Sequence, residues 1–119
     1  MEIEISHRLG SKADQAAQLN DTIRREGLSA QWRLSPRVKQ LSLKNLEAVI
    51  QKVQDYEEFG FDTDRHESGT FRHEEKNYFW MIDYYRPYMG EQDLKSASPL
   101  DPSDPGTMRV LRLILQEEL

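Results

Sequence analysis

His66, Asp83 and Asp101 are of the residue types that perform acid–base catalysis, and they are spread over the C-terminal half of the chain. A hydrolase or nuclease-like enzyme needs a general base within hydrogen-bonding reach of a nucleophile or a water, so these side chains would have to converge in one cleft. Arg109 is a cation that could complete such a polar site. Because turns, caps and solvated faces employ most Asp and His residues, this small enzyme is kept as the alternative hypothesis.

Oxygen and imidazole groups that could ligate a metal ion follow one another over a short stretch. They belong to Asp62, Asp64, His66, Glu67 and His73. Their spacing does not match a calcium-binding loop, because the glycine and the distant glutamate of such a loop are missing. The chain also has no cysteine, which excludes thiolate zinc sites and iron–sulfur clusters. We therefore expect no metal and no other cofactor.

The same stretch is the most acidic part of the chain, with six acids and one arginine from Asp55 through Glu67. The acids are Asp55, Glu57, Glu58, Asp62, Asp64 and Glu67. Residues 1–44 have a net charge of +3 and residues 45–119 a net charge of −8, which sum to the total of −5. An acidic chain is poorly suited to neutralise phosphates. We therefore expect a partner protein or ribonucleoprotein with a basic surface, and no direct binding of nucleic acid.

Two amphipathic helices are expected to position these residues. Ser11 can cap a first helix over residues 11–26, with Gly27 as its stop. Ser42 can cap a second helix, for which Gly60 could close the end. Its apolar stripe is formed by Leu43, Leu46, Val49, Ile50, Val53 and Tyr56.

Four β-prone runs are expected to form the sheet. Apolar residues alternate over residues 28–34, and two runs at 70–73 and 78–85 are separated by polar residues, which predicts a hairpin. The segment ending in residues 110–115 fits either a strand or a helix. We favour a strand, because Glu117 and Glu118 would lie at the negative end of a helix dipole.

The run YFWMIDYYRPY, Tyr78 to Tyr88, holds six of the chain's eleven aromatic residues. In an extended chain both of its faces are apolar, which predicts a central strand covered on each side. Asp83 is the exception, since a carboxylate in such a strand must find a partner. Arg109 or Arg112 on the neighbouring strand could provide it.

Length and composition predict one α+β domain over residues 1–119, in which residues 1–10 are an N-terminal extension or an edge segment. We expect an antiparallel sheet of about four strands packed by two amphipathic helices. The N-terminus lacks the features of a signal peptide, and no apolar run is long enough to span a bilayer. We therefore expect a cytoplasmic protein without membrane contact, either a monomer or a homodimer.

Four segments in order carry a family resemblance. They are Gln18 to Arg24, Phe79 to Tyr85, Ser98 to Pro105, and Thr107 to Leu115. Together they resemble the signature of domain-of-unknown-function family 3768, which occurs in bacteria and on their plasmids and prophages. The chain departs from that signature in two places. Arg65 to Gly69 stands where the family has Glu-His-Asp-Phe-Gly, and Met81 stands where the family has a lysine.

The resemblance implies a cytoplasmic protein of genomes rich in mobile elements, and it implies no activity. Small size, an acidic surface and the absence of a catalytic motif favour a non-enzymatic protein that binds another macromolecule. We hypothesise, as the most specific form, a phage- or plasmid-borne inhibitor of a host defence complex, similar to an anti-CRISPR. Its acidic residues 55–67 would block a basic groove.

Overall fold

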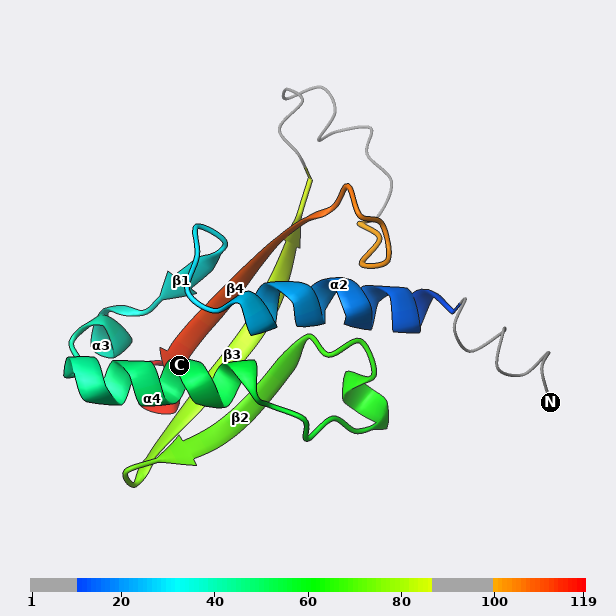
Figure 1. Cartoon of the computed structure of the whole chain (residues 1–119). Coiled ribbons are helices and arrows are strands. Elements are labelled where there is room, and N and C mark those ends of the chain that lie inside the picture. The colour runs from blue at the N-terminus through cyan, green and yellow to red at the C-terminus, as the bar shows by residue number, and fades with distance from the viewer. Residues whose placement is uncertain (1–10, 87–99) are drawn as a thin grey trace.

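Two long helices and a four-stranded sheet dominate the computed structural model, which describes residues 11–86 and 100–119 (Figure 1). The predicted N-terminal segment, residues 1–10, lies outside the described residues. The helices are α2 (Lys12–Glu26), the short α3 (Pro36–Lys39) and α4 (Leu43–Gln54). The strands are β1 (Trp32–Leu34), β2 (Ser68–His73), β3 (Lys76–Tyr85) and β4 (Met108–Leu115), and two 3₁₀ turns are η1 (Phe61–Thr63) and η2 (Gln116–Glu118). The predicted α+β class is confirmed.

Local capping determines where both long helices begin. Ser11 accepts a hydrogen bond from the Asp14 N–H at 3.1 Å, and Ser42 accepts one from the Asn45 N–H at 3.2 Å. The helix α2 ends at Gly27, whose φ of 83° is in the region that favours glycine. The helix α4 ends earlier than the predicted stop at Gly60, and residues 55–60 are irregular.

The strands are ordered β1-β4-β3-β2, and β3 pairs antiparallel with both β2 and β4. The strand β1 instead pairs parallel with β4, with Trp32 opposite Leu111. The sheet is therefore mostly antiparallel, as we expected, and the parallel pairing of β1 with β4 makes it mixed. No hairpin joins β1 to β4, so no local turn determines their relative direction.

The predicted hairpin is confirmed, and its turn is shorter than expected. Glu74 and Glu75 form a two-residue turn with φ values of 48° and 66°, and His73 pairs with Lys76. Such positive angles match the twist of the two strands. The strand β3 therefore begins two residues before Tyr78. The C-terminal segment is a strand, as we expected.

The core lies between the sheet and the two long helices. Tyr78, Trp80 and Ile82 of β3 point into it, and both helices lie on that face of the sheet (Figure 1). Other core residues are Ile23, Trp32, Val38, Val49, Val53, Leu111, Leu113 and Leu115. On the opposite face Phe79 and Met81 are half-buried. The expectation that both faces of this strand are covered is therefore not met by the described helices.

Candidate functional site

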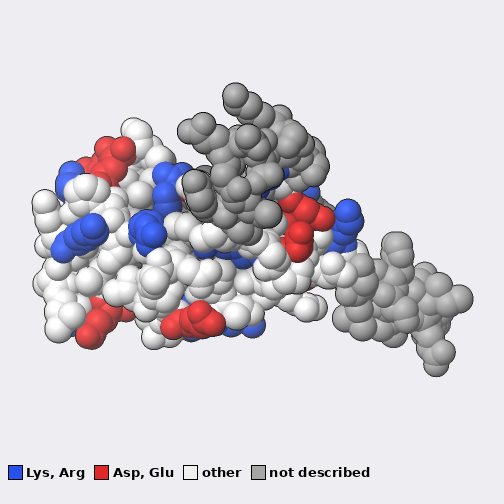
Figure 2. Space-filling model, turned by 90° about the horizontal axis from the view of Figure 1, so that it is seen from above, with Lys and Arg blue, Asp and Glu red and all other residues white. Residues whose placement is uncertain are grey.

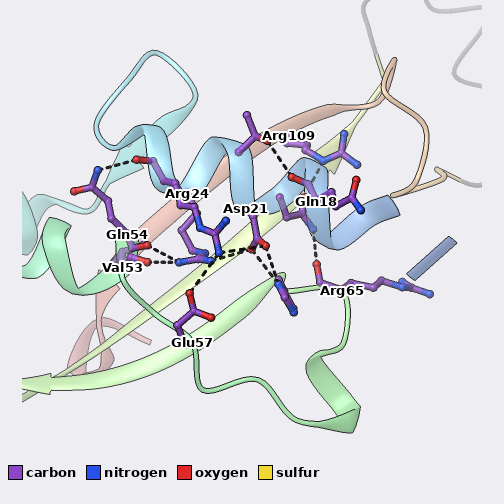
Figure 3. Close-up of polar contacts among 12 residues, drawn as sticks. Gln18, Asp21, Arg24, Val53, Gln54, Glu57, Arg65 and Arg109 are labelled. Carbon is purple, nitrogen blue, oxygen red and sulfur yellow. Dashed lines mark hydrogen bonds and ion pairs between the residues drawn. The ribbon is translucent and has the colours of Figure 1, made fainter. Parts of the chain in front are cut away.

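Polar residues interrupt the buried stripe of α2. Asn20 and Arg24 are each 0% exposed and lie on the same side of the helix as Ala16 and Ile23. Such groups are costly to bury without partners. Together with Asp21, their side chains form a network with the end of α4 and with residues 55–67, the segment that we call the acidic loop (Figure 3).

Arg24 fixes the point where α4 gives way to the acidic loop. Its Nη1 donates to the carbonyl oxygens of Val53 at 2.9 Å and Gln54 at 2.7 Å. These are among the carbonyls that a helix leaves without partners at its C-terminus. The guanidinium also lies 5.4 Å from the centre of the Phe59 ring, and its Nη2 donates to Asp21 at 2.9 Å. One buried cation therefore holds together α2, α4 and the start of the loop.

Asp21 joins α2 to His66 near the end of the acidic loop. The Nδ1 of His66 is 3.0 Å from Asp21 Oδ1, and the ring stacks on Phe59 with 3.9 Å between centroids. His66 has a φ of 56°, an uncommon conformation for a residue other than glycine. Contacts on two sides of the ring hold the residue in that conformation. Within residues 11–86 and 100–119 its second ring nitrogen, Nε2, makes no hydrogen bond.

Asn20 holds the end of the loop to the sheet. Its Nδ2 donates to the Arg65 carbonyl oxygen at 3.0 Å and to the Tyr84 hydroxyl at 2.9 Å, and its Oδ1 accepts from Arg109 Nε at 2.8 Å. The Tyr84 hydroxyl donates to Glu67 at 2.6 Å. Burial and then this hydrogen bond raise the pKa of Tyr84 above its ordinary value, so the hydroxyl stays a neutral donor.

The predicted partner-binding acids differ in how free their carboxylates are. Five of them are exposed: Asp55, Glu57, Glu58, Asp62 and Asp64. The Asp55 carboxylate accepts a hydrogen bond from Gln51 Nε2 at 2.9 Å, and Glu57 Oε1 is 3.4 Å from Arg25 Nη2. Glu67 is half-buried and accepts the hydrogen bond from the Tyr84 hydroxyl.

Three carboxylates in the acidic loop have neither a side-chain hydrogen bond nor an ion pair within the part of the chain that the structure describes: Glu58, Asp62 and Asp64. Between them Phe61 is fully exposed, with a relative accessibility of 103%. The view from above shows other parts of the surface, where basic and acidic side chains lie in several small groups of both signs (Figure 2). In the acidic loop, three carboxylates without partners among the described residues therefore lie close in sequence to an exposed aromatic ring.

The structure does not bring His66 and Asp83 together. Asp83 lies on the opposite face of the sheet from Tyr84 and pairs with Arg112 at 2.5 Å, which confirms one of the two partners that we expected for it. Asp101 lies in a turn, where it accepts from the Ser103 hydroxyl at 2.7 Å and the Ser103 N–H at 2.9 Å. These bonds lower the pKa of Asp101.

Arg109 is a structural cation in this arrangement. It is 4% exposed and donates to Asn20, to the Thr107 carbonyl at 3.1 Å and to the Pro102 carbonyl. Burial lowers the pKa of Arg109, although a guanidinium keeps its charge at any ordinary pH. Arg109 therefore connects the turn that holds Asp101 to α2, and does not face an open cleft with His66.

Sequence reasoning missed the partner of His66, which is Asp21, and the supporting side chains of Asn20 and Arg24. The signal was present, since residues 16, 20 and 24 are spaced four apart on the buried stripe of α2. Within residues 11–86 and 100–119 no group of three His, Asp or Glu side chains is placed to hold a metal ion. No helix in these ranges is long and apolar enough to cross a membrane.

The fold and the site define a small α+β domain in which a buried polar network supports an acidic loop. The chain belongs to the family described as protein of unknown function (DUF3768), whose profile matches residues 34–118. The match begins at the last residue of β1, so the polar motif of α2 precedes the matched region. No curated protein and no solved structure matches the chain.

Proposed function

We propose that this protein is a non-enzymatic binding protein that uses its acidic loop to contact a basic surface on a protein or ribonucleoprotein. The observation that carries the proposal is the combination of three unpaired carboxylates with a fully exposed aromatic ring on one supported loop. The carboxylates belong to Glu58, Asp62 and Asp64, and the ring to Phe61. Aromatic residues dominate the energy of protein interfaces, and charges around them increase the rate of encounter.

The support beneath the loop favours binding. Arg24, Asp21 and Asn20 hold the loop at its start and near its end through hydrogen bonds to Gln54, His66 and Arg65. A segment that is already ordered loses less conformational entropy when a partner binds. The loop can therefore contribute more of its contact energy to affinity than an unsupported acidic tail could.

The most specific form of the proposal is inhibition of a defence ribonucleoprotein in the cytoplasm, as anti-CRISPR proteins do. Grooves that bind nucleic acid are lined by Lys and Arg side chains, which neutralise phosphates. Carboxylates on a protruding loop can take the place of those phosphates and exclude the nucleic acid. The negative charge of residues 45–119 and the charge of the loop support this form.

The test is a charge-reversal experiment in bacterial lysate that contains active CRISPR and other defence complexes. A variant with Glu58→Lys, Asp62→Lys and Asp64→Lys is compared with a matched control, Glu26→Lys, Glu47→Lys and Glu75→Lys, which changes the net charge equally at exposed sites elsewhere. Both are used as tagged baits at low and moderate salt, and bound proteins are identified by mass spectrometry.

We expect the wild type and the control to retain a stoichiometric, salt-sensitive partner that the loop variant loses. Equal capture by the two variants would exclude the loop as the contact surface. A competition assay with the nucleic acid of the captured complex then tests inhibition, because a blocked groove must release its nucleic acid in proportion to the protein added.

A proton-transfer site at His66 is the second candidate, and one observation favours it. Asp21 holds Nδ1 of His66, which leaves Nε2 as the acid or base, an orientation that hydrolytic sites also use. This pair replaces the predicted set of His66, Asp83 and Asp101. Turnover in a panel of ester, phosphodiester and peptide substrates that is lost in a folded His66→Gln variant would support an enzyme. Equal background rates for both proteins would exclude one for those substrates.

A further inference from the structure

Among the residues that the structure describes, the strand β2 forms an open edge of the sheet. It is the last strand in the order β1-β4-β3-β2, and its neighbour on the other side is β3. The Ile82 N–H donates to the Glu67 carbonyl at 2.8 Å, and the register continues through Gly69 opposite Trp80. Hydrogen-bonded pairs alternate along an antiparallel ladder, so the N–H and C=O groups of Thr70 and Arg72 point away from β3.

These outward groups border a groove of about 660 Å³ between α4 and the edge of the sheet. One wall is formed by Ala48, Gln51 and Lys52 of α4, and the other by Thr70 to Arg72 of β2. Within the described chain Lys52 Nζ donates to the Arg72 carbonyl at 3.2 Å, whereas Thr70 makes no hydrogen bond on this side. An unpaired edge of this kind is a template for another strand.

The acidic loop supplies the remaining wall of the groove. Asp55, Glu57 and Glu58 line it together with the aromatic side chains of Tyr56 and Phe71. Glu57 is 3.4 Å from Arg25, whereas Asp55 and Glu58 have no ion pair in the described chain. The cations of the lining are Lys52, which is engaged with a backbone carbonyl, and Arg72. The side chain of Arg72 belongs to the opposite face of the sheet from Phe71. The groove therefore presents backbone donors and acceptors beside an excess of negative charge.

We propose that this groove binds an extended, Lys- or Arg-containing segment of the partner as an additional strand beside β2. The inference rests on the proposed function, because the groove adjoins the acidic loop and Glu58 belongs to both surfaces. Main-chain hydrogen bonds to Thr70 provide affinity without regard to sequence, and alternate side chains of the segment reach Asp55 and Glu58. An acidic segment would meet like charge at the same positions.

The test uses synthetic peptides with the full-length protein. The first probe alternates lysine and valine, and the second is the same peptide with alternate backbone nitrogens methylated, which keeps the charge and removes the N–H donors of one edge. A third probe alternates glutamate and valine. Affinities are measured by calorimetry at low salt, and the Thr70 and Arg72 amides are followed by nuclear magnetic resonance.

We expect the lysine peptide to bind, the methylated and acidic peptides to bind about tenfold more weakly or worse, and the exchange of the Thr70 amide to slow in the complex. Thr70→Pro should weaken binding of the lysine peptide similarly, because it removes one outward N–H donor. The variant should still fold, since an edge position tolerates proline. Thr70→Val keeps that N–H and should bind as the wild type does. The methylated peptide keeps the test valid if the proline variant is unfolded.

Failure to bind the lysine peptide, or equal affinity for its methylated form, would overturn the inference. Failure of the pairing is distinguishable from failure of the proposed function. If the loop charge-reversal variant still loses its lysate partner while methylation has no effect, the acidic loop acts by charge alone. If that variant keeps its partner, the proposed function itself is wrong, whatever the peptides do.

Discussion

Glu118 lies one residue from the end of the chain, yet its carboxylate joins three parts of the fold. It accepts from the Ser35 hydroxyl at 2.5 Å, from the Leu115 N–H at 2.9 Å and from the Arg37 N–H at 3.3 Å. Burial opposes ionisation, but these hydrogen bonds outweigh it and lower the pKa of Glu118 below its ordinary value of 4.5. The charged form therefore stabilises the folded state.

We expect Glu118→Gln to lower the free energy of unfolding by about 1–2 kcal/mol at neutral pH, because charged hydrogen bonds are lost. Since the folded pKa is below the unfolded one, the contribution is present above the unfolded value of 4.5 and is lost as pH falls through the folded pKa. Urea unfolding from about pH 6 to about pH 3 checks this, and the wild type should lose more stability than the variant. Glu47→Gln, at an exposed site on α4, is the control.

Gly69 is a position where a side chain cannot be accommodated. A Cβ there would lie 2.6 Å from Trp80 Nε1 and 2.6 Å from Tyr56 Cζ, which is far closer than two such atoms can approach. Gly69→Ala should therefore lower the free energy of unfolding by about 1–3 kcal/mol, because the buried Trp80 ring and the half-buried Tyr56 ring must move. Gly106→Ala, where the nearest atom is a flexible Asp104 carboxylate oxygen at 3.3 Å, should be close to neutral. Equal stability of the two variants in urea would contradict this packing.

The buried side of helix α2 carries a charged residue, Arg24, among its apolar ones. We expect Arg24→Met to cost about 3–5 kcal/mol, since the change leaves the carbonyls at the end of α4 and the Asp21 carboxylate without their cation. Arg25→Met is the matched control. Its guanidinium is 57% exposed and makes only long ion pairs, so the cost should be below about 1 kcal/mol. Thermal unfolding compares the two, and similar losses would show that burial of Arg24 is not decisive.

The same substitution tests the support of the acidic loop. In Arg24→Met the exchange of the amides of residues 57–66 should accelerate relative to the wild type, whereas the exchange of the β4 amides should change little. The loop loses its attachment while the sheet remains paired. Uniformly faster exchange over both regions would instead indicate general destabilisation of the domain.

How far the sequence predicted each element depended on how local its signals were. Both long helices, the hairpin and the C-terminal strand were predicted because caps, turn residues and hydrophobic periodicity are encoded within each segment. The parallel pairing of β1 with β4 was not, because it joins residues about eighty positions apart with no turn to orient them. The strand β1 is also shorter than its alternation of apolar residues indicated.

The sequence predicted which segment of the chain carries the acidic residues of the candidate site. It did not predict which side chains contact one another there. The acids of residues 55–67 are evident in the sequence, but only the structure shows that Glu67 is bonded to Tyr84 and that Glu58 is free. Asn20 and Arg24 were missed because a helix pattern assigns polar residues to the solvent side. His66 was recognised as a candidate, whereas its partner Asp21 lies in a distant segment.

On the scale of the whole molecule, the family match starts at residue 34, yet the domain depends on what precedes it. Helix α2 contributes Ala16, Ala17 and Ile23 to the core and all of the buried polar motif. We expect a fragment of residues 28–119 to lack a cooperative thermal transition by circular dichroism, because it exposes one side of the core. A sharp transition near that of the full chain would show that the matched region folds alone.

The order of the strands also determines when the protein can fold during its synthesis. The strand β4 lies between β1 and β3, and it is the last strand to be made. Until β4 has emerged from the ribosome, β1 has no partner among the strands that the structure describes, and β3 exposes one edge. The nascent chain can therefore form its helices and the β2–β3 hairpin first, and the sheet is completed only once β4 has been made and can pair with both neighbours.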